Sequence, residues 1–121
     1  TSSVYRILSG RANIFLTDPV DYPALLWLIK KCDLIISDSG GIQEEAPSFG
    51  KPVIVTRDSS ERMEGVKAGF AFLTGTSKTE IIKRAEQVFN SPAKCGEVQN
   101  PYGDGFAAKR IVDRLEELEW E

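Results

Sequence analysis

The sequence predicts an α/β domain with a parallel sheet, and three observations support this prediction. Short β-branched runs alternate with longer amphipathic stretches along the chain, which is typical of strands joined by right-handed helical crossovers. The run from Asp33 to Ser37 has a continuously apolar centre, as strands buried on both faces of a parallel sheet have. With 121 residues the chain has the length of one domain. We therefore expect a single three-layer domain with a parallel sheet over residues 1–121.

The expected strands are short and β-branched, and turn signals bound them. They lie at residues 13–17, 33–37, 52–56 and 69–73. The Asp18-Pro19 pair ends the first strand, and Gly75 closes the last one. Before the first strand the chain reads as the tail of a helix. A sheet of only four strands, entered in mid-pattern, suggests that upstream sequence is missing.

The expected helices carry apolar residues at helical spacing and begin at capping residues. They lie at residues 22–31, 42–48, 77–89 and 105–119. Asp21 and Pro23 are start signals for the first helix. Ser77, with Glu80 three residues later, has the pattern of a capping box, and Asp104 is placed to cap the last helix.

The composition argues against several classes of function. A net charge of −3 does not suit non-specific nucleic-acid binding, which needs a basic surface. No apolar run approaches the roughly 20 residues that span a bilayer, and the start lacks a signal-peptide pattern, so we expect no membrane partner and a cytoplasmic location. The chain has no histidine and two cysteines far apart, which removes the commonest general base and the usual metal ligands. We expect it to bind more than it reacts, without a metal.

The strongest local signal is the turn Ser39-Gly40-Gly41, which follows the apolar strand and opens a helix. Ligands of open α/β sheets bind at this carboxyl edge. Two glycines let the backbone approach a phosphate closely, and the amides of the helix start favour its negative charge. The alternative is a tight turn in which Ser39 caps the helix without a ligand. We favour a phosphate site.

Glu45 lies four residues after Gly41 and projects from the same helix face one turn deeper. A carboxylate at that distance from a diphosphate suits the two hydroxyls of a ribose. The alternative is a glutamate that only complements the helix dipole. Glu44 points elsewhere and is expected to face solvent or a neighbouring element.

A charged loop, residues 57–65, follows the next strand, and parallel topology brings it to the same sheet edge. An arginine there can neutralise a diphosphate with a fork of donors. Arg62 and Arg57 are both candidates, with Glu61 or Glu64 orienting the one used. The alternative is a solvated loop of mutually paired charges.

Taken together, two motifs resemble a specific family. The segment SDSGGIQEEAPSFGKPVIVTRDSSERMEGVKAG, followed by NPYGDG at residues 100–105, is similar to the C-terminal region of the non-hydrolysing UDP-N-acetylglucosamine 2-epimerases. NPYGDG by itself reads as a structural turn. The order SGG-x-QEE-A-P, strand, ER-x-E-G is far more specific than a lone glycine turn. The hydrolysing epimerases rank second, since they usually show a serine-rich variant of the glycine turn.

The resemblance implies the C-terminal half of a GT-B fold, in which two Rossmann-like halves close on a UDP-sugar. It also implies interconversion of UDP-N-acetylglucosamine and UDP-N-acetylmannosamine by elimination and re-addition of UDP, without a cofactor. The residues carried over by position to UDP binding are Ser39, Gly40, Gly41, Glu45, Arg62 and Leu25. The first three and Arg62 correspond to the diphosphate and Glu45 to the ribose. Leu25 stands where related sequences often place an aromatic residue near the uracil.

The resemblance also implies what this chain lacks. The family's catalytic acids and its important histidine belong to upstream regions, so no catalytic residue is expected here and the isolated chain is expected to be inactive. The chain looks truncated, and its partners are the missing N-terminal half of the same protein and, in the longer protein, a second copy in a homodimer. Two other classes stay open: the nucleotide-binding half of a GT-B UDP-sugar glycosyltransferase, and a free-standing nucleotide-binding module without catalysis.

Overall fold

A computed structural model describes residues 2–90 and 99–118, and it confirms an α/β domain built on a parallel sheet. The strands are β1 (Ile35–Ser37), β2 (Val53–Val55) and β3 (Ala71–Leu73). They lie in the order β1-β2-β3, and all neighbours run parallel. In register, Ile35 lies beside Val53, and Val53 lies beside Ala71. The carboxyl ends of all three strands therefore meet at one edge of the sheet.

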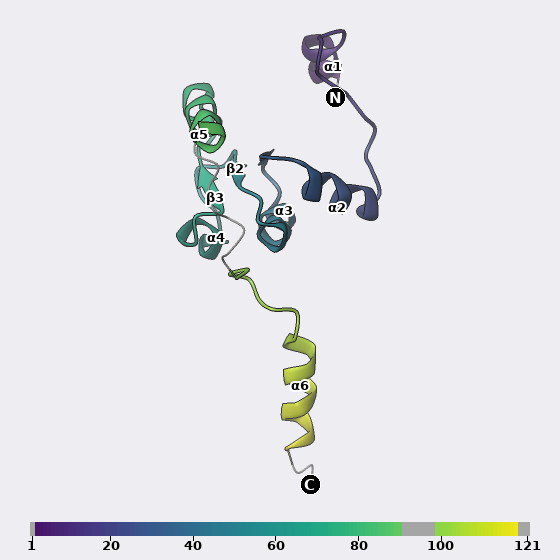
Figure 1. Cartoon of the computed structure of the whole chain (residues 1–121), viewed down its shortest axis with the longest axis vertical. Helices are drawn as coiled ribbons and strands as arrows, with labels where there is room; N and C mark the ends of the chain where they lie inside the picture. The colour runs from purple at the N-terminus through teal and green to yellow at the C-terminus, as the bar shows by residue number, and fades with distance from the viewer. Residues whose placement is uncertain (1, 91–98, 119–121) are drawn as a thin grey trace.

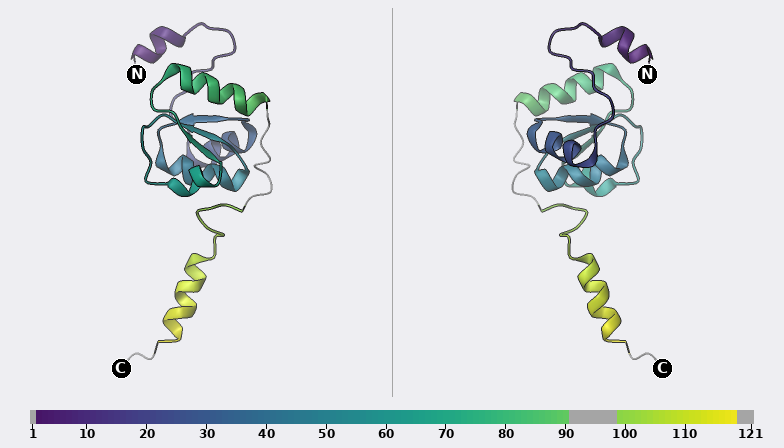
Figure 2. Two further views of the ribbon diagram at one scale, coloured as in Figure 1. Left: turned by 90° about the vertical axis from the view of Figure 1, so that its left-hand side faces the viewer. Right: turned by 90° about the vertical axis from the view of Figure 1, so that its right-hand side faces the viewer.

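Helices pack on both faces of this sheet. The α-helices of the described residues are α1 (Ser2–Leu8), α2 (Tyr22–Lys31), α3 (Gly40–Glu45), α4 (Met63–Lys67), α5 (Lys78–Asn90) and α6 (Ala107–Glu116). A 3₁₀ helix, η1 (Ala46–Phe49), continues α3. Figure 2 shows α5 on one side of the strands and α3 and α4 on the other, which gives the predicted three layers. The short helix α4 lies where the sequence indicated only a charged loop, because five residues are too few to show helical periodicity.

The core of the domain lies around the central strand. Val53, Ile54 and Val55 of β2 are almost completely buried, and Ala46 and Ala71 pack against this strand from η1 and β3. The sequence predicted instead that the strand before the glycine turn is buried on both faces. In the structure β1 is an edge strand, and Ile36 at its centre is 53% exposed. A continuous apolar run in the sequence indicates a strand, but it does not reveal how many strands flank that strand in the described sheet.

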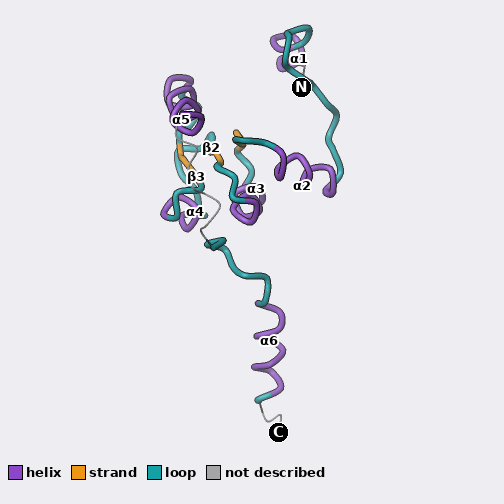
Figure 3. Tube along the Cα trace, in the orientation of Figure 1, coloured by secondary structure: helices purple, strands orange, loops and turns teal. Residues whose placement is uncertain are grey.

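The predicted strand at residues 13–17 is wrong: this segment is a loop, so the described sheet has three strands instead of four (Figure 3). Phe15 is 89% exposed, and Asn13 has a φ of 66°, which interrupts an extended chain. An extended segment becomes a strand only when another strand satisfies its main-chain groups, and no described strand pairs with this one. The helix tail expected before it is confirmed as α1.

The helix boundaries follow the predicted capping residues closely. Asp21 Oδ1 accepts a hydrogen bond from the Ala24 amide at 3.0 Å and caps α2. The Glu80 amide donates to Ser77 Oγ at 3.4 Å at the start of α5. The helix expected at residues 42–48 is present as α3 and η1, and it ends at Gly50, whose left-handed φ of 64° suits a residue without a Cβ. The predicted end of the last helix, at 119, lies outside the described residues.

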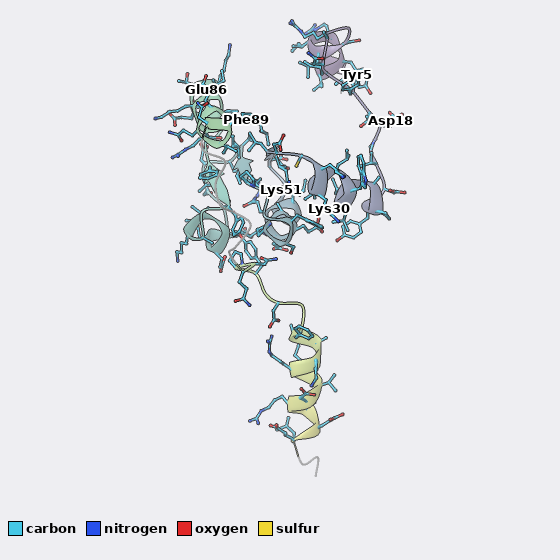
Figure 4. All side chains as sticks on the ribbon, viewed as in Figure 1. Tyr5, Asp18, Lys30, Lys51, Glu86 and Phe89 are labelled. Atoms are coloured by element: carbon cyan, nitrogen blue, oxygen red, sulfur yellow. The ribbon has the colours of Figure 1, made fainter. Side chains whose placement is uncertain are left out.

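Two helices extend away from the sheet and its packed helices. Figure 1 shows α6 projecting from one end of the domain, and Tyr5 on α1 lies apart from the sheet in Figure 4. The exposed apolar side chains of α6 and its flanks are Phe106, Ile111, Val112, Leu115 and Leu118. In the part of the chain that the structure describes, no helix has the length and apolar character needed to cross a membrane.

Asp104 anchors the start of α6, and its titration is the first testable prediction. It pairs with Arg110 and accepts a hydrogen bond from the Phe106 amide at 3.0 Å. These contacts lower the pKa of Asp104 from its ordinary 3.8 to about 2. Because the folded pKa is lowered, their stabilising effect is fully present above pH 3.8 and is lost as the pH falls through about 2.

Carbon-13 NMR of the carboxyl group measures this titration directly. We expect a midpoint near pH 2 in the unsubstituted chain and a clearly higher one in Arg110→Ala, since the largest cause of the shift is then removed. An unsubstituted midpoint at the ordinary value of 3.8 would show that the Asp104–Arg110 pair does not form.

Candidate functional site

The glycine turn lies at the carboxyl end of β1, as predicted. Ser37 Oγ accepts a hydrogen bond from the Ser39 amide at 3.0 Å and fixes the chain between the strand and α3. Ser39 has an extended backbone at the N-cap position of α3, and its side chain makes no capping hydrogen bond. The alternative in which the Ser39 hydroxyl caps the helix is therefore wrong. Neither Gly40 nor Gly41 has a positive φ, so backbone conformation does not explain the glycines, and at Gly40 the close approach of another group does.

One group that approaches this turn is the side chain of Arg62. A Cβ added to Gly40 would lie 2.6 Å from the Arg62 guanidinium carbon and 2.6 Å from its Nη1. The guanidinium therefore rests directly on the first residue of α3. The structure thus brings together Arg62 and the glycine turn, which the sequence placed at the same sheet edge from topology alone.

Glu44 orients Arg62, a role that the sequence had assigned to Glu61 or Glu64. Arg62 Nε donates to Glu44 Oε1 at 2.5 Å, whereas Glu61 is 95% exposed and its carboxylate lies 4.0 Å from Arg62 Nη1. The hydrogen bond and charge of Glu44 raise the pKa of Arg62 above its usual range. Arg57, the other candidate arginine, is exposed, and within residues 2–90 and 99–118 its side chain has no hydrogen-bond or ion-pair partner.

Glu45 lies half-buried at the end of α3 and faces α2. The Tyr22 hydroxyl donates to Glu45 Oε1 at 3.0 Å, and this hydrogen bond is the main cause that raises the pKa of Tyr22. Leu25 is half-buried one turn further along α2, so it shares a helix face with Tyr22. Sequence reasoning missed Tyr22, because nothing local indicates a contact across 23 residues.

A buried glutamine links the glycine turn to the arginine loop. Gln43 is 1% exposed, and its Nε2 donates to the Ser39 carbonyl at 3.2 Å. Its Oε1 accepts from Ser60 Oγ at 2.8 Å, and Ser60 Oγ in turn accepts from the Arg62 amide at 3.0 Å. This chain fixes the loop that carries Arg62 against α3. Sequence reasoning assigned no role to Gln43 or Ser60.

The arrangement suits binding better than bond breaking. Free amides at a helix start and a guanidinium attract an anion at one edge of the sheet, and the carboxylate of Glu45 one turn deeper is an acceptor for hydroxyls. Among the described residues no three histidine, cysteine, aspartate or glutamate side chains gather closely enough to hold a metal ion. The fold and this site define a parallel α/β domain with a candidate anion-binding edge.

The chain belongs to the UDP-N-acetylglucosamine 2-epimerase family, whose model matches residues 1–116. It is 46% identical over 115 residues to the UDP-N-acetylglucosamine 2-epimerase of Escherichia coli K12, an alignment that covers 93% of this chain and 31% of that protein. With the enzyme of the same name from Campylobacter jejuni the identity is 42% over 115 residues, covering 93% of this chain and 30% of that protein. The chain thus spans about a third of the length of the curated relatives that it matches.

Solved structures agree with this assignment. The UDP-GlcNAc 2-epimerase of Neisseria meningitidis bound to UDP-GlcNAc has a TM-score of 0.85 and 42% identity, covering 97% of this chain and 33% of that one. The S. aureus MnaA–UDP co-structure has a TM-score of 0.86 and 42% identity, covering 95% of this chain and 32% of that one. The predicted fold class, a Rossmann-like part of a GT-B fold, is confirmed.

The contact between Gly40 and Arg62 gives a second testable prediction. In Gly40→Ala the new methyl group occupies the space of the guanidinium, so Arg62 must move while the fold survives, because a flexible side-chain end yields easily. We expect Tm to change by no more than a few degrees, which thermal unfolding measures.

Gly41→Ala is the matched structural comparison, because the nearest atom to its added Cβ is Ser39 Oγ at 3.9 Å. Carbon-13 NMR of the Arg62 guanidinium carbon separates the two variants. Its signal should shift in Gly40→Ala and stay in place in Gly41→Ala. An unshifted signal in Gly40→Ala would contradict the packing of Arg62 on Gly40.

Proposed function

We propose that this chain is the UDP-binding part of a longer UDP-N-acetylglucosamine 2-epimerase. The longer protein interconverts UDP-N-acetylglucosamine and UDP-N-acetylmannosamine by elimination and re-addition of UDP. One observation carries the proposal: the Arg62 guanidinium rests on Gly40 at the start of α3, and the same helix carries Glu45 one turn further on. This spacing matches a diphosphate followed by a ribose.

The roles of the individual residues follow from their positions. Gly40 and Gly41 supply amides and Ser39 supplies a hydroxyl to the diphosphate, because the Ser39 amide already donates to Ser37 Oγ. Arg62 neutralises the charge of the diphosphate with the donors that Glu44 does not use. Glu45 keeps Oε2 for the ribose hydroxyls, because Tyr22 occupies its Oε1.

The uracil is expected to lie along α2. Leu25 follows Tyr22 by three residues on the same helix face, and Tyr22 contacts the ribose-binding carboxylate. A base attached to that ribose therefore reaches the side of α2 where Leu25 is half-buried. An aliphatic side chain there offers apolar contact but no ring to stack on.

The reacting groups are proposed to lie outside this chain. It has no histidine, and the two carboxylates of α3 are engaged, Glu44 by Arg62 and Glu45 by Tyr22. We therefore propose that no catalytic residue lies in this chain and that the isolated chain is inactive.

The proposed partner of this chain is an N-terminal half of the same protein. The exposed apolar side chains of α6, which projects from the domain (Figure 2), support a packing surface for further protein. Assembly of the longer protein into a homodimer and its cytoplasmic location are further expectations from the family. Size-exclusion chromatography with light scattering tests the homodimer.

The glycosyltransferase alternative receives no support from the comparisons. An experiment distinguishes the other alternative, a free-standing nucleotide-binding module, from part of an enzyme. The coding sequence upstream of Thr1 should continue in frame into an acidic, histidine-containing region. The longer protein should convert UDP-N-acetylglucosamine without an acceptor, and the 121-residue chain should not. A start codon directly upstream of Thr1, or turnover by the isolated chain, would overturn the proposal.

A further inference from the structure

We propose that the NPYG turn, residues 100–103, is a positioning element for the phosphate-binding arginine, Arg62. The inference rests on the proposed function, because it assigns a purpose to this turn within the same UDP site. Considered as sequence, the turn reads as a structural feature that precedes the last helix. In the structure its side chains reach back across the domain and hold two segments that meet at Arg62.

Tyr102 binds the main chain on both sides of the start of α4. Its hydroxyl donates to the Arg62 carbonyl at 2.9 Å and accepts from the Gly65 amide at 3.0 Å. These contacts span 40 and 37 residues, so no local preference produces them. Arg62 precedes the first turn of α4. The single hydroxyl of Tyr102 therefore links the first turn of this helix to the main chain of Arg62.

Asn100 binds the other segment, α3 and η1. Its Nδ2 donates to Ser48 Oγ at 2.7 Å and to the Glu44 carbonyl at 3.4 Å, and its Oδ1 accepts from the Tyr102 amide at 2.9 Å. The turn therefore joins the residue that orients Arg62, which is Glu44, to the residue that holds the Arg62 main chain, which is Tyr102.

Arg62 is consequently held at three points. The Arg62 amide donates to Ser60 Oγ, the Arg62 carbonyl accepts from the Tyr102 hydroxyl, and Arg62 Nε donates to Glu44 Oε1. An arginine side chain loses considerable rotational freedom when it binds a phosphate. Because the main chain and Nε of Arg62 are held before the phosphate binds, the entropic cost of binding is smaller, and the direction in which the guanidinium donors point is set in advance.

The same contact explains the glycine of the ER-x-E-G motif. Gly65 is buried, and a Cβ there would lie 2.6 Å from the Tyr102 hydroxyl. The glycine leaves room for the tyrosine oxygen to reach both main-chain groups. The ER-x-E-G and NPYG motifs are therefore parts of one contact.

The test is Tyr102→Phe in the longer protein, which removes the hydroxyl and keeps the ring. We expect the Kd for UDP to rise about tenfold, because two hydrogen bonds that place Arg62 are lost. The Kd for uridine, which has no phosphate for Arg62, should stay unchanged. Calorimetry measures UDP and ligand-observed NMR measures uridine. Tyr5→Phe is the matched control, since Tyr5 lies on α1 apart from the site (Figure 4).

Each outcome decides between the positioning role and a purely structural one. If Tyr102→Phe raises the Kd for UDP but not the Kd for uridine, and changes Tm by no more than a few degrees, the positioning role is supported. Equal weakening of UDP and uridine, or no weakening of either, overturns it. Arg62→Ala separates the two proposals: if it lowers UDP affinity and Tyr102→Phe does not, the inference fails and the proposed function stands. If the unsubstituted protein binds no UDP, both fail.

Discussion

Replacing Arg62 by alanine is expected to weaken UDP binding by the longer protein about 100-fold, the largest effect of any substitution in this site. The guanidinium is the cation that rests on the glycine turn, and charge-assisted hydrogen bonds to a phosphate are about twice as strong as neutral ones. Without it, the diphosphate keeps the amides of the turn but loses its counter-charge. UDP titration by calorimetry gives the two dissociation constants.

Arg57→Ala is the matched control for this experiment. Arg57 belongs to the same loop and carries the same charge, but its side chain is exposed and has no hydrogen-bond or ion-pair partner within residues 2–90 and 99–118. We expect it to change UDP affinity less than about threefold, as a solvated charge does. Equal losses in both variants would mean that the loop acts through its net charge and that the position of Arg62 is irrelevant.

Replacing Glu45 by alanine is expected to weaken UDP binding about 30-fold and to abolish discrimination between UDP and 2′-deoxy-UDP. A carboxylate that accepts two ribose hydroxyls contributes charge-assisted hydrogen bonds that the deoxynucleotide makes only in part. The unsubstituted protein should therefore prefer UDP about tenfold. Competition between the two nucleotides, followed by calorimetry, measures the preference.

Glu86→Ala provides the control for Glu45. Glu86 is an exposed carboxylate on α5, which lies across the sheet from α3 (Figures 2 and 4). It should leave both affinities and the preference intact. If Glu45→Ala still preferred UDP as strongly as the unsubstituted protein, the assignment of Glu45 to the ribose would be wrong.

The features that the sequence predicted well are those that local patterns determine. Helix starts at Asp21 and Ser77 depend on hydrogen bonds over three residues. The glycine turn follows a short apolar strand, and strand-helix alternation indicates parallel pairing. These signals alone predict that Arg62 and the glycine turn lie at one edge of the sheet.

The features that the sequence did not predict depend on distant neighbours. Residues 13–17 have strand composition, but no described strand pairs with them. The exposure of Ile36 likewise depends on which strands flank β1. Pattern alone specifies neither, because pairing is decided by segments far away in the chain.

The same reasoning applies within the site. The sequence predicted that Glu61 or Glu64 orients Arg62, but Glu44, 18 residues away, binds it. Tyr22 and Tyr102 reach their partners across 23 and 40 residues. Residue types and spacing identified the groups expected to touch the ligand, while the side chains that orient those groups appeared only in three dimensions.

A crystal structure of the longer protein with UDP tests the central claim most directly. We predict that the diphosphate lies within hydrogen-bonding distance of the amides of Gly40 and Gly41 and of the Arg62 guanidinium, and that the ribose hydroxyls contact Glu45. UDP bound elsewhere, with its diphosphate touching neither the glycine turn nor Arg62, would contradict the account.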